Sequence, residues 1–356
     1  MVNESLDGLR ERIRELDLQL LAGVAERVAL ARQVGEIKRR QRLATVDYAQ
    51  ERAVLERARS LALERGLDPA VAEDLFTRLI RASVTAQDED SLRFSGAGAG
   101  RSAVVVGGAG RMGRWLRQFL TAQGYDAASL DPGAEPAESE RARRALPLVD
   151  LVVCSTPPVA TARLYEEWCA RPPAGVVVDI ASIKTPLVGP IRALQRAGGR
   201  VASIHPMFGP ATALLRDSDV VICDTGDGDA TAAVEKLFEP TTAHLVRLPL
   251  EEHDRMMGDL LSLAHAAAIA FALALPETSH PVRSTTFRAL ERLAADVVRE
   301  SPDVYFEIQA MNPHSADAVA RLLAGLERIV TAVGSRDSAG FGALLEEGRR
   351  RTPEAG

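Results

Sequence analysis

The sequence predicts a multidomain protein with an all-α N-terminal part, a central α/β part and an all-α C-terminal part. Three observations predict this order. Apolar residues recur every three or four positions over 5–40, short continuous apolar runs alternate with helix-like stretches over 102–248, and the helical period returns after about residue 250. The 356 residues, 46% of them hydrophobic, are enough for two to three domains. The expected boundaries are 1–88, a linker at 89–101, 102–248 and 249–356.

Composition and charge exclude several classes of protein. A net charge of -6 offers no general attraction for nucleic acid. We expect neither a membrane span nor export, because no apolar run reaches about 18 residues and the N-terminus carries no apolar secretory segment. Cys154, Cys169 and Cys223 are too few and too scattered for a disulfide framework or a zinc site, so no metal is expected. A reducing, cytoplasmic location follows as an expectation.

The N-terminal part begins with one long predicted helix over 5–40. Such a rod is roughly 50 Å long and cannot bury its apolar stripe against itself. We therefore expect partner helices, including those of a second copy of the chain in a homodimer. Two shorter helices are predicted at 47–65 and 69–87, and the acidic, then Gly/Ala-rich residues 89–101 are expected to form a linker.

The central part contains five continuous apolar runs, at 103–107, 150–156, 175–182, 200–206 and 219–225. Fully apolar strands alternating with helices predict a buried parallel sheet. In the C-terminal part, residues 260–275 are apolar on nearly every face of the predicted helix. We expect this helix to be buried, at a dimer interface.

A G-x-G-x-x-G motif at 108–113 follows the first apolar run and opens a helical stretch, as a Rossmann-like dinucleotide site requires. Gly108 is expected at the tight turn, Gly110 beside a pyrophosphate and Gly113 where helix meets strand. Asp131 ends the next apolar run, where a carboxylate would hold the ribose hydroxyls and repel a 2′-phosphate. The predicted cofactor is therefore NAD, and the remaining motif positions expected to bind it are Arg111 and Met112.

Polar side chains of the N-terminal helices could form a second site. At about 100° per residue, Arg27 and Lys38 share one face of the first helix, whereas Arg10 lies about 100° away, where it does not easily join the same pocket but could serve a neighbouring chain's pocket. The other two helices carry polar residues at helical spacing, namely Asp47, Gln50 and Glu51 on the second and Ser83 and Gln87 on the third. The plainer interpretation is solvated charge on helix surfaces.

The segments LRERI, AERVALARQVGEIK, VDYAQERAVLERA and ASVTAQ resemble the AroQ-type chorismate mutase domain through residues 1–88. The resemblance implies a Claisen rearrangement, which needs no base but a folded dianion and donors aimed at the ether oxygen. It implies these roles: substrate carboxylates at Arg27 and at Arg10 from the partner chain, the ether oxygen at Lys38 and Gln87, and the ring C4 substituent at Asp47 and Glu51, with Ser83 nearby.

The remaining motifs, among them VVVGGAGRMGR, VVVDIASIK, SIHPMFGP and EEHDRMM, resemble the prephenate dehydrogenase family. The order of the two resemblances is that of the bifunctional chorismate mutase/prephenate dehydrogenase family. It implies that chorismate is converted to prephenate and then, with NAD, to 4-hydroxyphenylpyruvate, as in tyrosine biosynthesis. Small-molecule substrates and a homodimer are the implied partners.

The second resemblance also implies roles for residues of the central and C-terminal parts. His205 would take the proton of the C4 hydroxyl, since an imidazole suits that task near neutral pH. Ser182 would orient His205, and Arg288 would bind a substrate carboxylate. His265, a polar group in an apolar helix, needs a partner for which substrate is one candidate. The turn formed by Ser155, Thr156 and Pro157 would run alongside the bound cofactor.

Lys184 and His253 have more than one interpretation. Lys184 is either near substrate or cofactor or an ordinary surface lysine. His253 is expected to cap a helix start together with Asp254.

Two departures from the families keep alternatives open. Gln50 stands where the mutase family usually has arginine, and residues 211–214 replace a polar tail after HPMFGP. Both lie near substrate in the resembling enzymes, so one alternative is the same pair of reactions on the 4-amino-4-deoxy analogues, in p-aminophenylalanine (antibiotic) biosynthesis. The other alternative makes the N-terminal bundle a dimerisation or regulatory module without mutase activity, although the retained charged donors argue against it.

Overall fold

The structure, a computed structural model, describes residues 5–41, 43–210, 212, 215, 218–276 and 282–352 and contains two compact units. The first unit comprises Met1–Thr156, Glu166–Ile180 and Ala193–Arg247. The second comprises Pro157–Tyr165, Ala181–Arg192 and Leu248–Gly356. The second unit therefore consists of the C-terminal helices together with two short segments from the middle of the chain.

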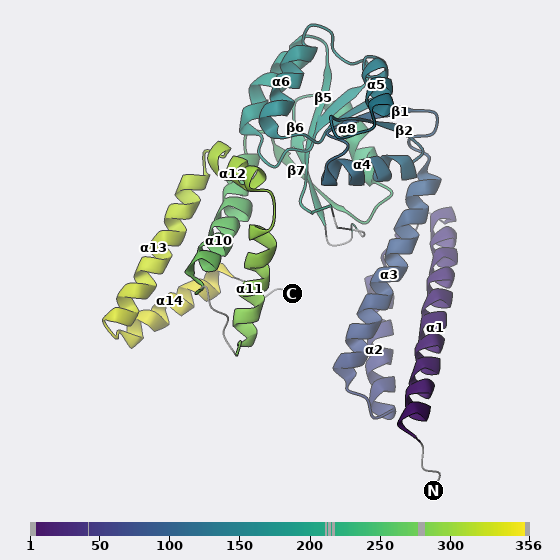
Figure 1. Ribbon diagram of the computed structural model, residues 1–356, viewed down its shortest axis with the longest axis vertical. Coiled ribbons are helices and arrows are strands. Elements are labelled where there is room, and N and C mark those ends of the chain that lie inside the picture. The colour runs from purple at the N-terminus through teal and green to yellow at the C-terminus, as the bar shows by residue number, and fades with distance from the viewer. Residues whose placement is uncertain are drawn as a thin grey trace. The chain divides into compact units, whose positions relative to one another are not determined.

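Three helices form the N-terminal part of the first unit: α1 (Leu6–Arg40), α2 (Tyr48–Glu64) and α3 (Pro69–Ser95) (Figure 1). Side chains of Ser5, Asp47 and Asp68 accept hydrogen bonds from the first turns, as helix-capping residues do. Both α1 and α2 pack against α3. Most of the apolar stripe on α1 remains uncovered within one chain, since Ile13 and Leu20 are 58% and 62% exposed.

Helix α3 extends beyond its predicted end at residue 87 and continues to Ser95, so the first part of the predicted linker is helical. The reason is burial: Ser91 is buried, Leu92 packs against the core of the sheet, and Asp88 accepts a hydrogen bond from Thr242. Gly96 ends the helix with φ +59°, a left-handed conformation that favours glycine.

The centre of the first unit is a seven-stranded sheet in the order β2-β1-β3-β4-β5-β6-β7. The predicted runs form strands, but the sheet is not wholly parallel, because β6 pairs antiparallel with β5. A fully buried strand is apolar in either direction, so its sequence does not reveal which way it runs. The strands are β1 (Ser102–Val106), β2 (Asp126–Leu130), β3 (Leu151–Cys154), β4 (Val176–Asp179), β5 (Arg200–Pro206), β6 (Asp219–Asp224) and β7 (His244–Pro249).

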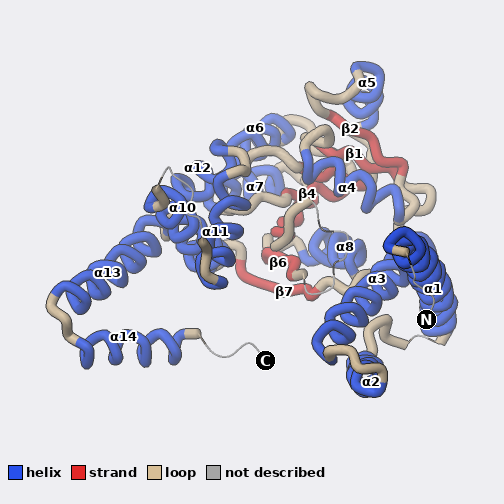
Figure 2. Tube along the Cα trace, turned by 60° about the horizontal axis from the view of Figure 1, so that its bottom comes forward, coloured by secondary structure: helices blue, strands red, loops and turns tan. Residues whose placement is uncertain are grey.

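The sheet's main core lies on one face, where Val105, Val153, Val178, Ile204 and Ile222 are buried together. Helices α4 (Arg111–Ala122), α5 (Pro136–Ala145) and α8 (Gly228–Phe238) flank the strands (Figure 2). Two further helices are α6 (Pro158–Trp168) and α7 (Val188–Arg196). Each begins in a segment assigned to the second unit and ends in a segment assigned to the first.

The second unit is mainly helical, as predicted. The apolar helix expected at 260–275 begins as a π-helical turn, Gly258–Leu263 (η2), in which the carbonyl of Ser262 accepts a hydrogen bond from Gln309 at 3.0 Å. Its elements are η1 (Thr185–Leu187), α9 (His253–Met257), η2, α10 (Ala264–Ala274), α11 (Thr285–Val298), α12 (Pro302–Met311), α13 (Ser315–Gly334) and α14 (Ser338–Arg351).

Large apolar side chains remain on the surface of the second unit. Leu293, Phe306 and Val330 are 54%, 70% and 70% exposed. Within the described residues, the helical run His253–Ala274 is long and apolar enough to cross a membrane, a weak indication that core helices of soluble proteins also give. The pattern also agrees with the expected dimer face, which stays a prediction.

Candidate active sites

A cavity of about 280 Å³ lies among α1, α2 and α3. Its walls combine a set of apolar side chains with the polar residues that helical spacing had pointed to. Every polar residue predicted for this site lines the cavity, apart from Arg10. The polar lining residues are Arg27, Lys38, Thr45, Asp47, Gln50, Glu51, Ser83 and Gln87.

Arg27 reaches from α1 to α3. Its Nη1 donates to the carbonyl of Leu79 at 2.7 Å and to the hydroxyl of Ser83. Burial lowers the pKa of the Arg27 guanidinium from its usual value, because the cation loses hydration there. Among the residues described, no carboxylate forms an ion pair with it. A half-buried guanidinium with donors to spare favours an anion in the cavity.

Lys38 and Gln87 place further donors at the cavity. The Lys38 ammonium donates to the carbonyl of Thr45 at 2.8 Å, which leaves two of its three hydrogens for other acceptors. Gln87 is buried on α3, and its Oε1 has no hydrogen-bond partner. Gly35 lets α1 approach here, since a Cβ at this position would be 2.7 Å from Cγ of Gln87. The unsatisfied atom is an acceptor and calls for a hydrogen-bond donor on a ligand, whereas the NH2 group of the same amide is the part that can donate.

Asp47 and Arg10 are placed differently from the other predicted residues. Asp47 lines the cavity, but its carboxylate also accepts from the backbone N–H of Gln50 at 3.0 Å and so caps α2. Arg10 lies near the beginning of α1, where its side chain is 59% exposed and 3.5 Å from Asp7. Within one chain the structure therefore does not bring Arg10 to the cavity, and its role in a partner's site stays a prediction.

A glycine-rich loop joins β1 to α4, as predicted. The tight turn was expected at Gly108, but the residue with the left-handed conformation is Gly107, with φ +80°. A Cβ on Gly107 would lie 2.4 Å from the Ser155 carbonyl oxygen, and one on Gly113 2.1 Å from that of Gly107. Gly110 occupies the N-cap of α4 without a side-chain cap, and a helix N-terminus of this kind favours a phosphate.

The other predicted cofactor residues surround this loop. The Asp131 carboxylate, just after β2, accepts from the backbone of Ala109 at 3.2 Å and of Gly133 at 2.7 Å. A carboxylate has about four acceptor positions, so it can still accept from ribose hydroxyls. Arg111 begins α4, while the side chain of Met112 packs against the core and leaves only its backbone for a cofactor. In the turn after β3, Ser155 and Thr156 lie against Gly107 and Pro157 follows.

His205 lies near the end of β5 and is buried. The register aligns Cys154, Asp179, Ser203 and Cys223 in one row across neighbouring strands. His205 follows Ser203 by two positions and therefore points to the same face of the sheet. This is the carboxyl edge of the parallel strands, where open α/β sheets bind ligands.

The second unit contains a polar cluster that sequence reasoning missed. The Asp254 carboxylate accepts from the backbone of Lys184 at 2.8 Å, from the backbone of Thr185 at 2.7 Å and from the Thr185 hydroxyl at 2.6 Å, and it pairs with His253 Nδ1 at 2.7 Å. Asn312 donates to the Asp254 carbonyl at 2.8 Å. Asp254 thus anchors the segment after Ser182 to α9.

This cluster corrects two interpretations. Lys184 is fully buried, so the surface-lysine alternative is wrong. His253 and Asp254 do interact, but the N-cap residue of α9 is Glu252, which makes no side-chain cap hydrogen bond. The pair is buried and binds the 184–185 segment rather than capping the helix. Because the contacts join residues 70 positions apart, no local pattern could have revealed them.

The anchoring role of Asp254 predicts a pH-dependent loss of stability. Burial alone would raise the pKa of Asp254, but hydrogen bonds from His253, Thr185 and the backbone lower it overall. A lowered pKa stabilises the fold above the unfolded-state value, about 3.9, and this stabilisation disappears as pH falls through the folded value. We expect Asp254→Asn to cost about 2 kcal/mol near neutral pH.

Thermal unfolding of the wild type and the variant at a series of pH values measures this effect. The difference in Tm should shrink as pH falls below about 4. Asp296→Asn, an exposed carboxylate on α11, is the matched control and should leave the Tm unchanged. A Tm difference that is constant with pH would contradict the assignment.

His265 and Arg288 lie on neighbouring helices of the second unit. The ring of His265 on α10 lies 4.3 Å, centre to centre, from the ring of Tyr305 at a tilt of 60°, and its Nδ1 has no hydrogen-bond partner. Burial lowers the pKa of His265, which favours the neutral ring. Arg288 is exposed on α11. An unsatisfied ring nitrogen fits a ligand contact, whereas the carboxylate role of Arg288 stays a prediction.

Comparison with known protein families matches two parts of the chain. Residues 9–88 match the family described as chorismate mutase type II. Residues 123–247 match the nucleotide-binding domain of prephenate dehydrogenase. The first match covers the three helices around the cavity, and the second covers most of the sheet.

Individual relatives extend over more of the chain. The T-protein of Enterobacter agglomerans is 29% identical over 85% of this chain and 81% of its own length. The 4-amino-4-deoxyprephenate dehydrogenase of Streptomyces pristinaespiralis is 32% identical over 68% of this chain and 88% of its own. The crystal structure of A. aeolicus prephenate dehydrogenase with hydroxyphenyl propionate and NAD+ superposes with a TM-score of 0.55 at 18% identity, over 70% of this chain and 97% of that one. This last likeness concerns the fold.

Proposed function

The chain belongs to the family that joins a chorismate mutase to a prephenate dehydrogenase, and we propose that it carries out both reactions in sequence. Chorismate would rearrange to prephenate in the cavity among α1, α2 and α3. Prephenate would then be oxidised and decarboxylated to 4-hydroxyphenylpyruvate, a step of tyrosine biosynthesis. The observation that carries the proposal is the convergence of Arg27, Lys38 and Gln87 on one cavity in a chain that also holds a dinucleotide-binding loop.

The mutase cavity suits a rearrangement that needs positioning rather than acid or base chemistry. Arg27, half-buried and without a carboxylate partner among the described residues, would hold a substrate carboxylate and so favour the folded conformer. Lys38 and the Gln87 amide would donate to the ether oxygen as the C–O bond breaks and negative charge grows there. A second carboxylate would be held by Arg10 of the other chain.

The loop after β1 fits NAD. The close backbone approaches at Gly107 and Gly113 leave no room for side chains and so hold the loop tightly against the turn after β3 and the start of α4. Gly110, at the N-cap of α4, would let a pyrophosphate approach the helix N-terminus. Asp131 would accept from the ribose hydroxyls and disfavour a 2′-phosphate. The chemistry that the dinucleotide supplies is acceptance of a hydride from ring carbon C4.

His205 would supply the acid–base part of the oxidation. As the C4 hydrogen departs with its electron pair, the C4 hydroxyl becomes acidic and passes its proton to the imidazole. The bond to the ring carboxylate then breaks, carbon dioxide leaves, and the bond's electrons complete the aromatic ring and move to the ring oxygen, which takes a proton back from the imidazole to form the phenol. Ser182 would orient the imidazole, while His265 and Arg288 would bind substrate.

We also propose that the protein is a cytoplasmic homodimer. The uncovered apolar side chains of α1, with Ile13 and Leu20 well exposed, and those of α11–α13 support this, since a monomer would leave both faces in water. Arg10 supports it independently, because it cannot reach the cavity of its own chain. A homodimer would complete each mutase cavity with a residue of the other subunit.

The amino analogue of the substrate is the less favoured alternative. Gln50 lines the mutase cavity, so this departure faces the space that substrate would occupy, whereas residues 211, 213 and 214 lie outside the described part of the chain. Because a Streptomyces relative is a 4-amino-4-deoxyprephenate dehydrogenase, the choice between the two substrates is tested by experiment.

A paired steady-state assay tests the proposed function. Purified protein receives NAD with either prephenate or 4-amino-4-deoxyprephenate, and reduced nicotinamide is followed by absorbance. We expect kcat/KM to favour prephenate by at least about tenfold, equivalent to 1.4 kcal/mol. A preference for the amino compound would contradict the proposal and make Gln50 the first residue to exchange. Conversion of chorismate is measured in the same preparation.

A further inference from the structure

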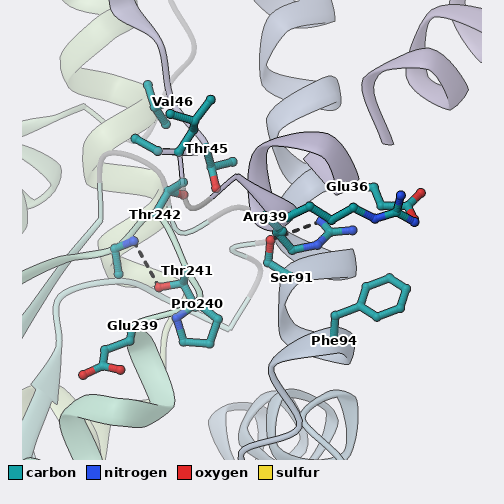
Figure 3. A pocket seen from close by; sticks show the side chains of 14 residues that line it. Glu36, Arg39, Thr45, Val46, Ser91, Phe94, Glu239, Pro240, Thr241 and Thr242 are labelled. Carbon is teal, nitrogen blue, oxygen red and sulfur yellow. Dashed lines mark hydrogen bonds and ion pairs between the residues drawn. The ribbon is translucent and has the colours of Figure 1, made fainter. Parts of the chain in front are cut away.

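A second cavity, of about 850 Å³, lies beside the mutase cavity within the first unit (Figure 3). Its walls are the end of α1, residues 43–46, the end of α3 and the turn 239–243 that leads into β7. We propose that this cavity binds a small organic carboxylate through Arg39 and that its occupant acts on the neighbouring mutase cavity. The second half of this proposal rests on the proposed function, whereas the first does not.

Arg39 is the group that selects the ligand. Its Nη1 donates to the Ser91 hydroxyl over a long 3.4 Å, and its guanidinium lies 4.8 Å from the centre of the Phe94 ring. Across the described part of the chain, no carboxylate lies within ion-pair distance of Arg39. Since a guanidinium carries five N–H donors in a planar fork, most remain for a bidentate carboxylate.

Other arginines of α1 do have carboxylate partners, so the lack of one at Arg39 is not general along the helix. Arg32 is neutralised by Glu89 and Asp90, and Arg40 by Glu36. Arg39 instead resembles Arg27, which also reaches a serine of α3 and also lines a cavity. The helix pair thus repeats one arrangement, an arginine held by a serine beside an open space, at two places.

The cavity also has apolar walls. Phe94 and Leu43 are 71% and 58% exposed, which is a high exposure for side chains of this size. Figure 3 shows Phe94 on α3 below Ser91, with Thr241 and Thr242 on the opposite side of the cavity. Both threonine hydroxyls donate within the protein, to Phe238 and Asp88, so they fix the wall instead of binding ligand. The matching ligand is a carboxylate attached to an apolar body.

Thr45 connects the two cavities, because it lines both. Its carbonyl accepts the hydrogen bond from Lys38 at 2.8 Å. On α3, Ser91 comes one turn after Gln87. A ligand that displaces residues 43–46 would therefore change the position of the Lys38 ammonium in the mutase cavity.

The binding half is tested with benzoate as the probe, by isothermal titration into the full-length protein. We expect saturable binding that Arg39→Gln weakens by at least about tenfold, as loss of a charge-assisted pair should. Arg57→Gln, an exposed arginine on α2, removes the same charge and should leave binding unchanged. Arg27→Gln should also bind normally, and benzamide, which has the same ring without the charge, should bind at least about tenfold more weakly.

Two binding results would overturn the proposal. If Arg27→Gln abolishes binding and Arg39→Gln does not, benzoate occupies the mutase cavity instead. If benzamide binds as well as benzoate, the guanidinium does not select the ligand. Both arms are read by titration and are independent of whether chorismate is the substrate.

The coupling half is tested by mutase kinetics. Benzoate at saturation should change kcat/KM for chorismate by at least about twofold in the wild type and in Arg57→Gln, and not in Arg39→Gln, whose activity without benzoate should match the wild type. Binding at Arg39 without any effect on the mutase would overturn the coupling and leave the site standing.

Discussion

Replacing Lys38 with alanine is expected to lower the mutase kcat by about 10²- to 10³-fold, the usual effect of removing one donor to a developing oxyanion. The ammonium lies at the cavity wall with one hydrogen bond to Thr45, so two of its hydrogens remain for the ether oxygen. The measurement is the loss of chorismate under saturating conditions. The dehydrogenase reaction with added prephenate should continue at its normal rate.

Two controls separate catalysis from folding. Lys236→Ala removes an exposed lysine of α8 and should leave mutase activity unchanged. Sedimentation should give the same mass for Lys38→Ala as for the wild type, because the exposed apolar faces, rather than the cavity, are expected to hold the dimer together. If Lys38→Ala retains full mutase activity, the rearrangement takes place elsewhere.

A glycine pair on α1 checks the same cavity from another direction. Gly35→Ala would place a methyl group 2.7 Å from Cγ of Gln87, whereas Gly23→Ala meets nothing within 4 Å. Gly35→Ala should therefore displace the Gln87 amide and lower mutase kcat by about tenfold or more, given that a 1 Å misplacement can cost about 10²-fold. Gly23→Ala should keep the activity.

Replacing His205 with asparagine is expected to lower the dehydrogenase kcat by about 10²- to 10⁴-fold, the range for loss of a general base. The side chain is buried at the carboxyl edge of the sheet, on the face that also carries Asp179 and Ser203. Asparagine keeps a polar side chain there but cannot take a proton. The measurement is the formation of reduced nicotinamide from prephenate at saturating NAD.

The affinity for NAD distinguishes a catalytic defect from a disrupted sheet. It should be almost unchanged in His205→Asn, because the glycine loop and Asp131 are expected to hold the dinucleotide. His244→Asn removes a mainly exposed histidine of β7, which pairs with Asp219, and should leave kcat unchanged. An unaltered kcat in His205→Asn would remove His205 from the mechanism.

Much of the mutase cavity could be predicted from the sequence. Helical spacing alone groups Arg27 with Lys38 and Ser83 with Gln87, and three long helices leave few ways to pack their polar stripes. Spacing also indicates that Arg10 does not easily join them from the same helix. Spacing does not show that the Asp47 carboxylate also accepts a hydrogen bond that caps α2.

The dehydrogenase part was less accessible to sequence reasoning. Gly107 and Gly108 are adjacent, and the motif spacing placed the tight turn at Gly108. The left-handed residue is Gly107, because the φ angle depends on the fold around the loop and not on the motif alone. The antiparallel direction of β6 leaves no mark in a fully apolar strand. The Asp254 cluster depends on contacts between distant segments, which neither periodicity nor motif spacing encodes.

The continuity of α3 restricts how the length of this chain can change during evolution. The helix carries Gln87 at the mutase cavity and, little more than one turn later, Leu92 on the core of the sheet. One inserted residue between them would turn Leu92 by about 100° and move it about 1.5 Å along the axis. Insertions and deletions should therefore be rare between these two positions and should accumulate after Gly96, where the helix has ended.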